Sequence, residues 1–425
     1  MNTLAPILII GAGQAGATAA ATLRALGHAG RIVLVGDELH APYERPPLSK
    51  SVLSGEQPDD QIGVHPAAFY ADSDIELQLG REVAYLDAEN AAAVYADGSV
   101  QPYSRCLLAT GGRARELPEL PAGTPGVHYI RSLDDARGLR TAIAEVESVL
   151  IIGGGFLGLE TAATALALGR AVTLVETGSQ LLPRAVPAMF SAWLATRARQ
   201  AGLNLMADAQ IAGISRTSQG ITVTLTDGLV LQAPLVVVAI GLVPETRLAR
   251  TASLELHASN GGIRIDAQGR TSAAHIYAAG DCASQYQPLF QKELRLESWQ
   301  SANEQARLSA AAMLDTNTSP QAVPWFWTDQ FGCNIQMLGA YDPDLDYALR
   351  GSTAHDPAPK FVLLGMEGDR LRHALAVNAG GDLRQLRPLL EQDAPIDAAS
   401  LQNTTLTLRQ LVRDALSAHA DASTS

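Results

Sequence analysis

At 425 residues, the chain is too long for a single hydrophobic core and predicts about three domains of ordinary size. Its net charge of −13, from 31 Lys and Arg against 44 Asp and Glu residues, argues against a surface that binds nucleic acid. With 47% apolar and 18% charged residues the composition argues against disorder, and apolar runs such as Ile7–Ile10 are too short to span a membrane. We expect a globular, cytoplasmic protein without a targeting segment or a membrane partner.

The first predicted elements are a buried strand at Ile7–Ile10, a glycine loop with Gly11, Gly13 and Gly16, and an Ala-rich helix. In such a loop the first glycine makes a tight turn, the second lets a pyrophosphate approach the backbone, and the third packs helix against strand. The next strand, at 31–35, leads to Asp37, where a carboxylate is expected to bind a ribose.

The same pattern returns 142 residues later, with a strand at 149–152, a glycine loop at 153–158, a helix through residue 167 and a strand at 171–175. Asp-Gly turns at 97–98 and 227–228, each before a strand that ends in glycine, repeat with an offset of 130 residues. An internal duplication explains both offsets if the first copy carries an insertion within 41–61. Glu176 ends the second copy without an adjacent Arg, which favours NADH over NADPH.

The rest of the chain predicts a linker at 113–125, a buried strand that ends in Gly-Asp at 280–281, and a helix at 297–313. From residue 323, alternating strands and two late helices indicate an α+β domain. Two dinucleotide sites in one chain indicate hydride transfer between a nicotinamide and a flavin. We therefore predict an α/β protein with a discontinuous FAD-binding domain (1–112 and 245–322), an NADH-binding domain (113–244), a C-terminal α+β domain (323–416) and a disordered tail (417–425).

Four motifs carry a family resemblance that covers the chain to about residue 416. They are P-Y-E-R-P-P-L-S-K at 42–50, G-G-G-F-L-G-L-E at 153–160, A-I-G-L-V-P at 239–244 and W-F-W-T-D-Q at 325–330. In these the chain resembles the FAD-dependent NADH:ferredoxin reductases of bacterial oxygenase systems. The resemblance implies a glutathione-reductase-like fold with two Rossmann-like domains. It also implies an enzyme of aromatic hydrocarbon catabolism that passes single electrons from FAD to a 2Fe-2S ferredoxin, Rieske or plant type, which serves a Rieske dioxygenase or a cytochrome P450. We expect a monomer or a homodimer.

The resemblance also implies site residues. Those expected to contact FAD are Gly11, Gly13, Ala15, Gly16, Asp37, Arg45, Lys50, Val83, Arg131, Asp281, Trp299 and Trp327, although Trp299 departs from the family pattern. Those expected to surround NADH are Gly153, Gly155, Phe156, Leu157, Gly158, Glu160, Glu176 and Gly241.

Lys50 and Glu160 are the expected catalytic pair. Lys50 places a cation where reduced flavin carries negative charge, and Glu160 pairs with it and orients the nicotinamide carboxamide. Without the resemblance, Lys50 reads as a surface lysine and Glu160 as an exposed acid that complements the helix dipole. Trp325 and Trp327 likewise read either as a flavin cover or as core aromatics.

Cys106, Cys282 and Cys333 form no C-x-x-C, and the segment 46–49, where related peroxidases carry a cysteine, has none. Electrons are therefore expected to leave the flavin singly. The nine His residues show no metal-ligand spacing, so no metal site is predicted. Two alternatives remain open: another acceptor, such as rubredoxin, a nitrite reductase partner or a quinone, or an interaction protein resembling apoptosis-inducing factor. The predicted lack of a targeting segment and of positive charge argues against the latter.

Overall fold

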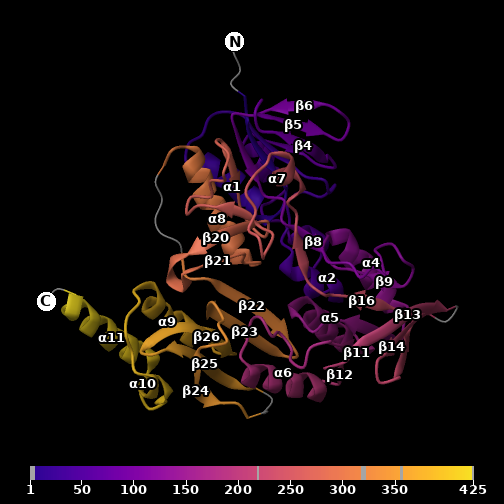
Figure 1. Cartoon of the computed structure of the whole chain (residues 1–425), viewed down its shortest axis with the longest axis vertical. Coiled ribbons are helices and arrows are strands. Elements are labelled where there is room, and N and C mark those ends of the chain that lie inside the picture. Colours follow the sequence, from indigo (N-terminus) through magenta and orange to yellow (C-terminus); the bar gives the residue numbers. More distant parts are fainter. Residues whose placement is uncertain (1–4, 218–219, 317–321, 355–357, 424–425) are drawn as a thin grey trace. The chain divides into compact units, whose positions relative to one another are not determined.

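The computed structural model describes residues 5–217, 220–316, 322–354 and 358–423 (Figure 1). The described residues form two compact units. Unit 1 is drawn from Met1–Pro46, Pro58–Arg113 and Leu242–Ala322, and unit 2 from Pro47–Gln57, Ala114–Gly241 and Val323–Ser425. The short segment Pro47–Gln57, which lies within the range predicted for the FAD-binding domain, is part of unit 2.

Unit 1 is organised around a parallel sheet of five strands in the order β19-β7-β1-β2-β3. Its central strands are short apolar runs that are buried on both faces, as in parallel sheets covered by other elements on each side. The strands are β1 (Ile7–Ile10), β2 (Ile32–Val35), β3 (Ile75–Gln78), β7 (Arg105–Leu108) and β19 (Ile276–Ala278).

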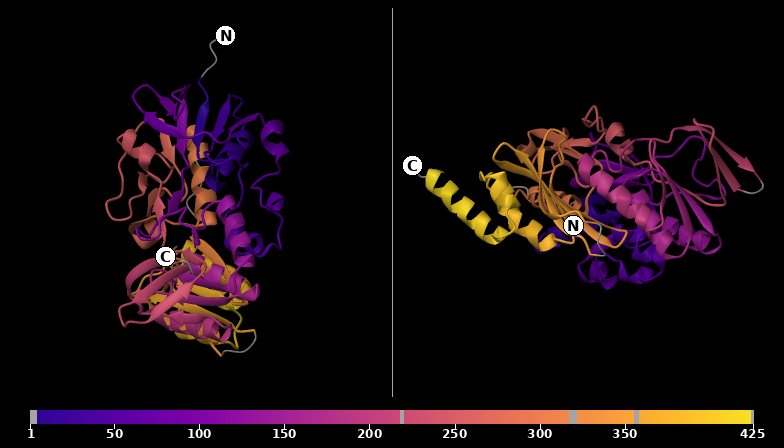
Figure 2. Two further views of the ribbon diagram at one scale, coloured as in Figure 1. Left: turned by 90° about the vertical axis from the view of Figure 1, so that its right-hand side faces the viewer. Right: turned by 90° about the horizontal axis from the view of Figure 1, so that it is seen from below.

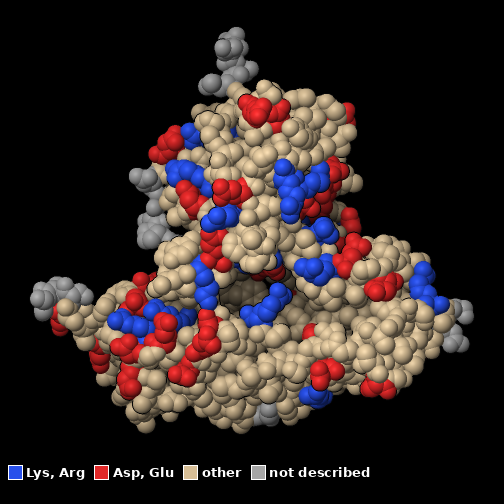
Figure 3. Space-filling model, in the orientation of Figure 1, with Lys and Arg blue, Asp and Glu red and all other residues tan. Residues whose placement is uncertain are grey.

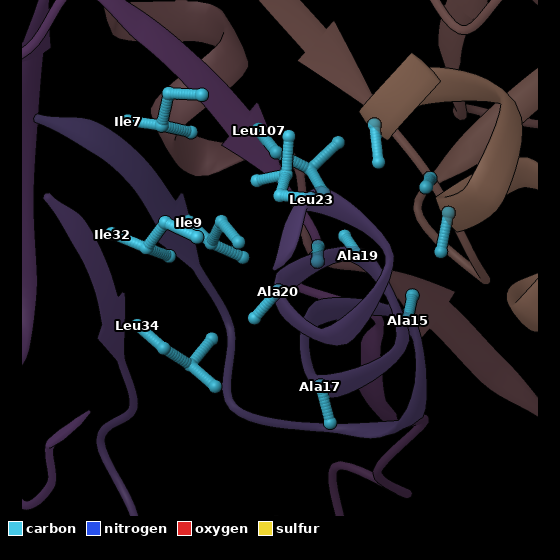
Figure 4. Close-up of a cluster of buried hydrophobic side chains, with 14 of the residues drawn as sticks. Ile7, Ile9, Ala15, Ala17, Ala19, Ala20, Leu23, Ile32, Leu34 and Leu107 are labelled. Atoms are coloured by element: carbon cyan, nitrogen blue, oxygen red, sulfur yellow. The ribbon is translucent and has the colours of Figure 1, made fainter. Parts of the chain in front are cut away.

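Helices α1 (Gln14–Ala25) and α8 (Trp299–Met313) pack against each other in the core of unit 1. Figure 4 shows Ala20 of α1 directed toward Ile9, Ile32 and Leu34 on β1 and β2, whereas Ala15 lies on the side of the helix turned away from these strands. The α1 residues Ala15, Ala17, Ala19, Ala20 and Leu23 belong to the same buried cluster as the isoleucine and leucine side chains of β1 and β2. Alanine at these positions keeps the helix backbone close to the sheet, so the glycine loop between β1 and α1 is held by a rigid core.

Smaller elements complete unit 1. Two three-stranded sheets, β4-β5-β6 and β18-β20-β21, accompany the main sheet. The remaining elements are β4 (Val83–Asp87), β5 (Ala92–Tyr95), β6 (Val100–Pro102), β17 (Leu242–Pro244), β18 (Ile263–Ile265), β20 (Ala283–Gln287), β21 (Lys292–Leu294), α3 (Ala68–Asp72), α7 (Arg247–Thr251), and the 3-10 turns η2 (Asp59–Gln61) and η3 (Pro288–Phe290); β8 (Gly112–Ala114) and the 3-10 turn η1 (Pro46–Ser49) lie where the chain passes to unit 2.

The first part of unit 2 repeats this plan with a parallel sheet in the order β12-β11-β10-β16-β9. Strand β10 and helix α5 stand where β1 and α1 stand in unit 1. The elements are β9 (Val127–His128), β10 (Ser148–Ile152), β11 (Ala171–Val175), β12 (Asn204–Met206), β16 (Val236–Val238), α2 (Ser51–Ser54), α4 (Leu133–Ala144), α5 (Phe156–Ala167), α6 (Ala188–Gln200), and an antiparallel sheet of β13 (Ile211–Thr217), β14 (Gly220–Leu225) and β15 (Val230–Ala233).

The C-terminal part of unit 2 is an antiparallel sheet in the order β22-β23-β26-β25-β24, with α9 packed on β23 and β26. Helix α11 packs on α9 and leads to the C-terminal end (Figure 2). The elements are β22 (Trp325–Gln330), β23 (Cys333–Gly339), β24 (Asp346–Ser352), β25 (Lys360–Glu367), β26 (Arg370–Val377), α9 (Gly380–Glu391), α10 (Ala398–Gln402) and α11 (Leu408–Ser423).

The tail predicted to be disordered at 417–425 differs from the structure, in which α11 continues through Ser423. This stretch contains Ala418, Ala420 and Ala422, and alanine has the highest helix propensity, so the helix begun at Leu408 is able to extend. In the described part of the chain, no helix combines the length and apolar character needed to cross a membrane.

A buried histidine lies inside the C-terminal sheet. His373 on β26 is 1% exposed, and its Nδ1 lies 2.8 Å from the hydroxyl of Tyr347 on β24. Burial lowers the pKa of His373 to about 4, because desolvation penalises the charged imidazole, and burial also raises the pKa of Tyr347, which keeps that hydroxyl protonated. The ring is therefore neutral at physiological pH and shares a hydrogen bond with the tyrosine hydroxyl.

We predict that acid destabilises the protein through His373. Its pKa is lower folded than unfolded, so its contribution is fully present above about pH 6.5 and is lost as pH falls toward 4, by roughly 3 kcal/mol. His373→Gln should flatten the pH dependence of the unfolding free energy in that window, whereas His275→Asn, at an exposed histidine, should leave it unchanged. Equal slopes for wild type and His373→Gln between pH 4 and 6.5 would contradict the assignment.

Candidate functional site

In each parallel sheet, the central strand is followed directly by a glycine with a left-handed backbone conformation. Gly11 has φ +116° and Gly153 has φ +112°, a region that side chains disfavour. A Cβ at Gly11 would lie 2.1 Å from the carbonyl oxygen of Ala109, and one at Gly153 would lie 2.4 Å from that of Ala239. Both turns therefore require glycine for conformation and for space.

The third glycine of each loop is equally crowded. A Cβ at Gly16 would lie 2.0 Å from the carbonyl oxygen of Gly11, and one at Gly158 would lie 2.0 Å from that of Gly153. These contacts hold α1 and α5 against the turns that precede them, which is the packing role expected from the motif.

The second glycine of each loop faces open space instead. A Cβ at Gly13 or Gly155 would meet no atom within 4 Å. Each of these residues caps its helix without a side-chain hydrogen bond, and the first turn of each helix carries no acid. Backbone N–H groups at a helix N-terminus with open space before them fit a pyrophosphate, so the residues present fit FAD at the first loop and NADH at the second.

Glu176 lies directly after β11 and braces the second loop. Its carboxylate accepts hydrogen bonds from the N–H groups of Gly154 at 2.6 Å and Gly178 at 2.7 Å. In the first copy the equivalent position is Gly36, because Val35 pairs with Ile10 as Val175 pairs with Ile152. Asp37 is one residue further on and exposed, so the two predicted ribose acids are not equivalent in the structure.

Lys50 and Glu160 form an ion pair in unit 2. The Nζ of Lys50 lies 3.0 Å from Oε1 of Glu160, and the side chains are 19% and 9% exposed. Lys50 directly precedes α2, whereas Glu160 lies in the second turn of α5, after the second glycine loop. The pair thus lies close to the residues that fit NADH, and both the surface-lysine and the exposed-acid alternatives are wrong for these side chains.

Two further hydroxyls complete the surroundings of Glu160. Ser49 Oγ donates to Oε2 at 2.5 Å, and Thr328 Oγ1 donates to Oε1 at 2.6 Å. Thr164 on α5 donates to the carbonyl oxygen of Ser49 at 2.7 Å, which fixes the segment before Lys50 against the helix. Sequence reasoning missed Ser49 and Thr328, although both lie inside motifs that carried the family resemblance.

The tryptophan segment is adjacent to this pair. The indole rings of Trp325 and Trp327 on β22 stack with centroids 5.0 Å apart, and the Lys50 Nζ lies 5.9 Å from the Trp327 ring centroid. Phe326 contacts Phe156, the first residue of α5, with ring centroids 4.6 Å apart. Strand β22 therefore contacts both the lysine and the start of the helix that follows the second glycine loop. The three residues of β22 are half-buried, and this differs from a fully buried core.

The other residues expected to contact FAD are divided between the units. In unit 1, Arg45 donates to Glu38 at 2.7 Å, and Trp299, the first residue of α8, donates through Nε1 to Glu44 at 3.1 Å. Asp281 follows Gly280, whose N–H donates to buried Gln305. The remaining predicted residues lie as follows: Ala15 is buried in α1, the Val83 side chain lies in the unit 1 core, Arg131 precedes α4 in unit 2, Leu157 lies in the first turn of α5, and Gly241, with φ +113°, ends the segment Ala114–Gly241 of unit 2.

Outside this site, many Arg side chains form ion pairs with nearby Asp or Glu side chains. On the face in Figure 3, Lys and Arg side chains are interspersed with Asp and Glu. Arg372, for example, pairs with both Glu367 and Asp393. Within the described ranges, no group of three or more His, Cys, Asp or Glu residues is placed to hold a metal ion.

All three cysteines are buried free thiols: Cys106, Cys282 and Cys333. Burial raises the pKa of each thiol, because a thiolate is poorly solvated in the core. None is therefore poised to react with a disulfide.

We predict that a thiol reagent such as 5,5′-dithiobis(2-nitrobenzoic acid) leaves the native protein unlabelled within minutes and titrates three thiols after denaturation. Alkylating conditions should likewise leave NADH oxidation unchanged. Rapid loss of activity that is matched by labelling of one native cysteine would show that a thiol takes part in the reaction.

Two parallel sheets, each with a glycine loop that fits a pyrophosphate, and a buried Lys–Glu pair beside the second loop define a flavin- and nicotinamide-dependent oxidoreductase. The family described as pyridine nucleotide-disulphide oxidoreductase matches residues 5–306, and the chain belongs to that family. A second family, described as reductase C-terminal, matches residues 325–412.

Similar proteins narrow this class. The biphenyl dioxygenase system ferredoxin–NAD(+) reductase component of Paraburkholderia xenovorans is 37% identical over 96% of this chain and 98% of its own length. The 3-phenylpropionate/cinnamic acid dioxygenase ferredoxin–NAD(+) reductase component of Photorhabdus laumondii is 36% identical over 92% and 97%. A solved structure of the covalent putidaredoxin reductase–putidaredoxin complex matches with a TM-score of 0.92 and 33% identity, covering 97% of this chain and 99% of that chain.

These findings confirm the predicted fold class, the resemblance to ferredoxin reductases, and the assignment as an enzyme that uses FAD and NADH. They leave the roles of individual residues as proposals.

Proposed function

We propose that the chain is an NADH:ferredoxin oxidoreductase that passes single electrons to a 2Fe-2S ferredoxin, Rieske or plant type, which in turn serves a Rieske dioxygenase or a cytochrome P450. One NADH and two oxidised ferredoxins give NAD+, one proton and two reduced ferredoxins. Bound FAD supplies a group that accepts two electrons together and returns them one at a time.

The observation that carries this proposal is the Lys50–Glu160 pair. Both side chains are mostly buried, and Glu160 lies in the second turn of the helix that follows the loop fitted to NADH. A buried cation beside an electron acceptor favours the gain of negative charge, because it is already oriented and needs little solvent reorganisation.

Glu160 has the additional task of orienting NADH. A carboxylate offers about four acceptor positions, and Lys50, Ser49 and Thr328 use three of them among the described residues. The remaining position suits one N–H of the nicotinamide carboxamide, which fixes the face of the ring that is presented for hydride transfer.

The glycine loops hold the phosphates of both dinucleotides at the N-termini of α1 and α5. Glu176, whose carboxylate already accepts hydrogen bonds from two backbone N–H groups, also accepts hydrogen bonds from the hydroxyls of the NADH ribose. Its negative charge disfavours the 2′-phosphate of NADPH. Arg45, Asp281, Trp299, Arg131 and the backbone of Val83 are the further groups that we assign to FAD.

The assignment of a ferredoxin as acceptor is supported by the relatives. Dioxygenase-system ferredoxin reductases match over nearly the whole chain, and one matching solved structure is a covalent complex of putidaredoxin reductase with putidaredoxin. The buried cysteines agree with delivery of single electrons rather than dithiol exchange. Three free thiols also fit the reducing environment of the cytoplasm, where we place the enzyme as a monomer or homodimer.

The test is NADH-driven reduction of cytochrome c, measured with no carrier, with a Rieske-type ferredoxin, with a plant-type ferredoxin, with rubredoxin and with a quinone. We expect a yellow protein that is bleached by stoichiometric NADH, oxidises NADPH more slowly, and reduces cytochrome c rapidly only with a 2Fe-2S ferredoxin. A rate that depends on rubredoxin or quinone instead would reassign the acceptor. A yellow protein that passes electrons from NADH to none of these acceptors would favour the flavin-binding interaction protein, and a colourless protein would contradict the assignment of FAD.

A further inference from the structure

Strand β22 extends the network around Glu160 by one more residue. Gln330, which is 2% exposed, donates through Nε2 to Thr328 Oγ1 at 2.9 Å, and Thr328 is fully buried. Thr328 in turn donates to Oε1 of Glu160 at 2.6 Å. The chain of donors runs from Gln330 through Thr328 to the carboxylate.

The direction of this chain is fixed by counting protons. A threonine hydroxyl has one proton, and Thr328 uses it on the carboxylate of Glu160, so its oxygen must accept from the Gln330 amide N–H. If the Gln330 amide were turned over, its oxygen would compete with Glu160 for that proton. The observed orientation therefore favours the hydrogen bond to Glu160.

In this orientation of the amide, the carbonyl oxygen of the Gln330 side chain lacks a hydrogen bond within the described part of the chain. This atom, Oε1, is buried, and none of the residues that the structure describes donates to it. A buried acceptor without a partner costs free energy, so the local hydrogen bonding satisfies Glu160 at the expense of Gln330. A strand that served packing alone would gain stability from an apolar side chain at this position.

We propose that Thr328 is a positioning residue for hydride transfer from NADH, and that Gln330 sets the direction of its hydroxyl. The hydroxyl holds the Oε1 atom that also pairs with Lys50, so it fixes where the carboxylate and the ammonium stand relative to each other. The C-terminal part of unit 2 thus controls the geometry of a pair contributed by α5 and by the segment before α2. This inference rests on the proposed function of Lys50 and Glu160.

The experiment measures anaerobic bleaching of the flavin by NADH in rapid mixing, with no ferredoxin present. Thr328→Val should lower the limiting rate at saturating NADH about tenfold and change the NADH dissociation constant less than about twofold. Thr328→Ser, which restores a hydroxyl, should return the limiting rate to within about twofold of wild type. Gln330→Leu should give a smaller loss than Thr328→Val, because the hydroxyl remains but is free to rotate.

A matched control lies next to Thr328 on the same strand. Asp329 is exposed and accepts from Asn334 at 2.7 Å, so Asp329→Asn should leave the limiting rate unchanged. In a Glu160→Gln background, Thr328→Val should change the rate less than about twofold, because the carboxylate that it positions is gone. An equal loss in both backgrounds, or no rescue by serine, would show that Thr328 only stabilises the fold.

A second measurement needs neither FAD nor NADH. Urea unfolding of FAD-free wild type, Thr328→Val, Glu160→Gln and the double variant forms a double-mutant cycle, and we expect the two changes to be less than additive. Additive effects would overturn the proposed contact. A wild-type protein that NADH does not bleach would refute the proposed function, whereas the cycle would still report on the contact itself.

Discussion

Glu160→Ala should abolish most of the reduction of bound FAD by NADH and should also destabilise unit 2. The substitution leaves the Lys50 ammonium, only 19% exposed, without its carboxylate, and removal of one partner of a buried pair typically costs about 3–5 kcal/mol. It also leaves the hydroxyls of Ser49 and Thr328 without their acceptor. We expect the limiting rate of flavin bleaching to fall by about 10²–10³-fold, as when a preorganised electrostatic group is removed.

Glu160→Gln separates the two effects, because it keeps the shape of the side chain and an acceptor oxygen but removes the charge. We expect a protein that folds and binds FAD, with a rate loss close to that of alanine but a smaller loss of stability. Glu147→Ala, at an exposed acid in the same unit, is the control for net charge and should behave as wild type. Unchanged flavin bleaching in Glu160→Gln would remove Glu160 from the catalytic pair.

The second large effect distinguishes two glycines of one loop. Gly158→Ala should destabilise unit 2 by about 3 kcal/mol or more, because the new Cβ would lie 2.0 Å from the carbonyl oxygen of Gly153, a backbone atom held by the sheet. Urea unfolding followed by circular dichroism measures this loss. NADH binding should fall with it, since the loop that fits the pyrophosphate has to move.

Gly155→Ala should weaken NADH binding while leaving the protein nearly as stable as wild type. The φ of −80° at Gly155 suits alanine, and the Cβ meets nothing within 4 Å, so stability should fall by only about 1 kcal/mol, the penalty for alanine at an N-cap. The open space is the one that we assign to the pyrophosphate, and the NADH dissociation constant should rise about tenfold or more. If Gly155→Ala binds NADH as wild type does, the pyrophosphate does not approach at this point.

The repeated strand, glycine loop and helix could be predicted because each copy is local in sequence and its glycines have few other uses together. The same spacing argument was weaker for Asp37. Strand register, which spacing alone does not reveal, shows that Gly36 in the first copy is equivalent to Glu176 in the second copy. Counting residues from the first glycine therefore found an acid near the strand end but not at the equivalent position.

The surroundings of Glu160 show a different limit. Glu160 and Thr328 are 168 residues apart, and no local pattern indicates that a strand of the C-terminal sheet donates to a helix of the nucleotide-binding sheet. Resemblance to a family supplied Lys50 and Glu160 as a pair, but not the hydroxyls that hold them. The extension of α11 has a local cause: the small polar residues after Ser417 favour disorder, but the alanines among them have high helix propensity and continue the helix through Ser423.

The assignment of three separate chain segments to each unit bears on how the protein is made. In unit 1, β7 pairs with β19, and Cys106 lies opposite Ile276, 170 residues further along the chain. At about 5–20 residues per second, a ribosome needs roughly ten to thirty seconds to supply that partner strand. During this interval β7 presents an unpaired edge of apolar residues, which is prone to pairing with other chains. The stretch Ala114–Gly241 contains every strand of the parallel sheet of unit 2. All strands of that sheet are therefore synthesised before β19, the last strand of the unit 1 sheet.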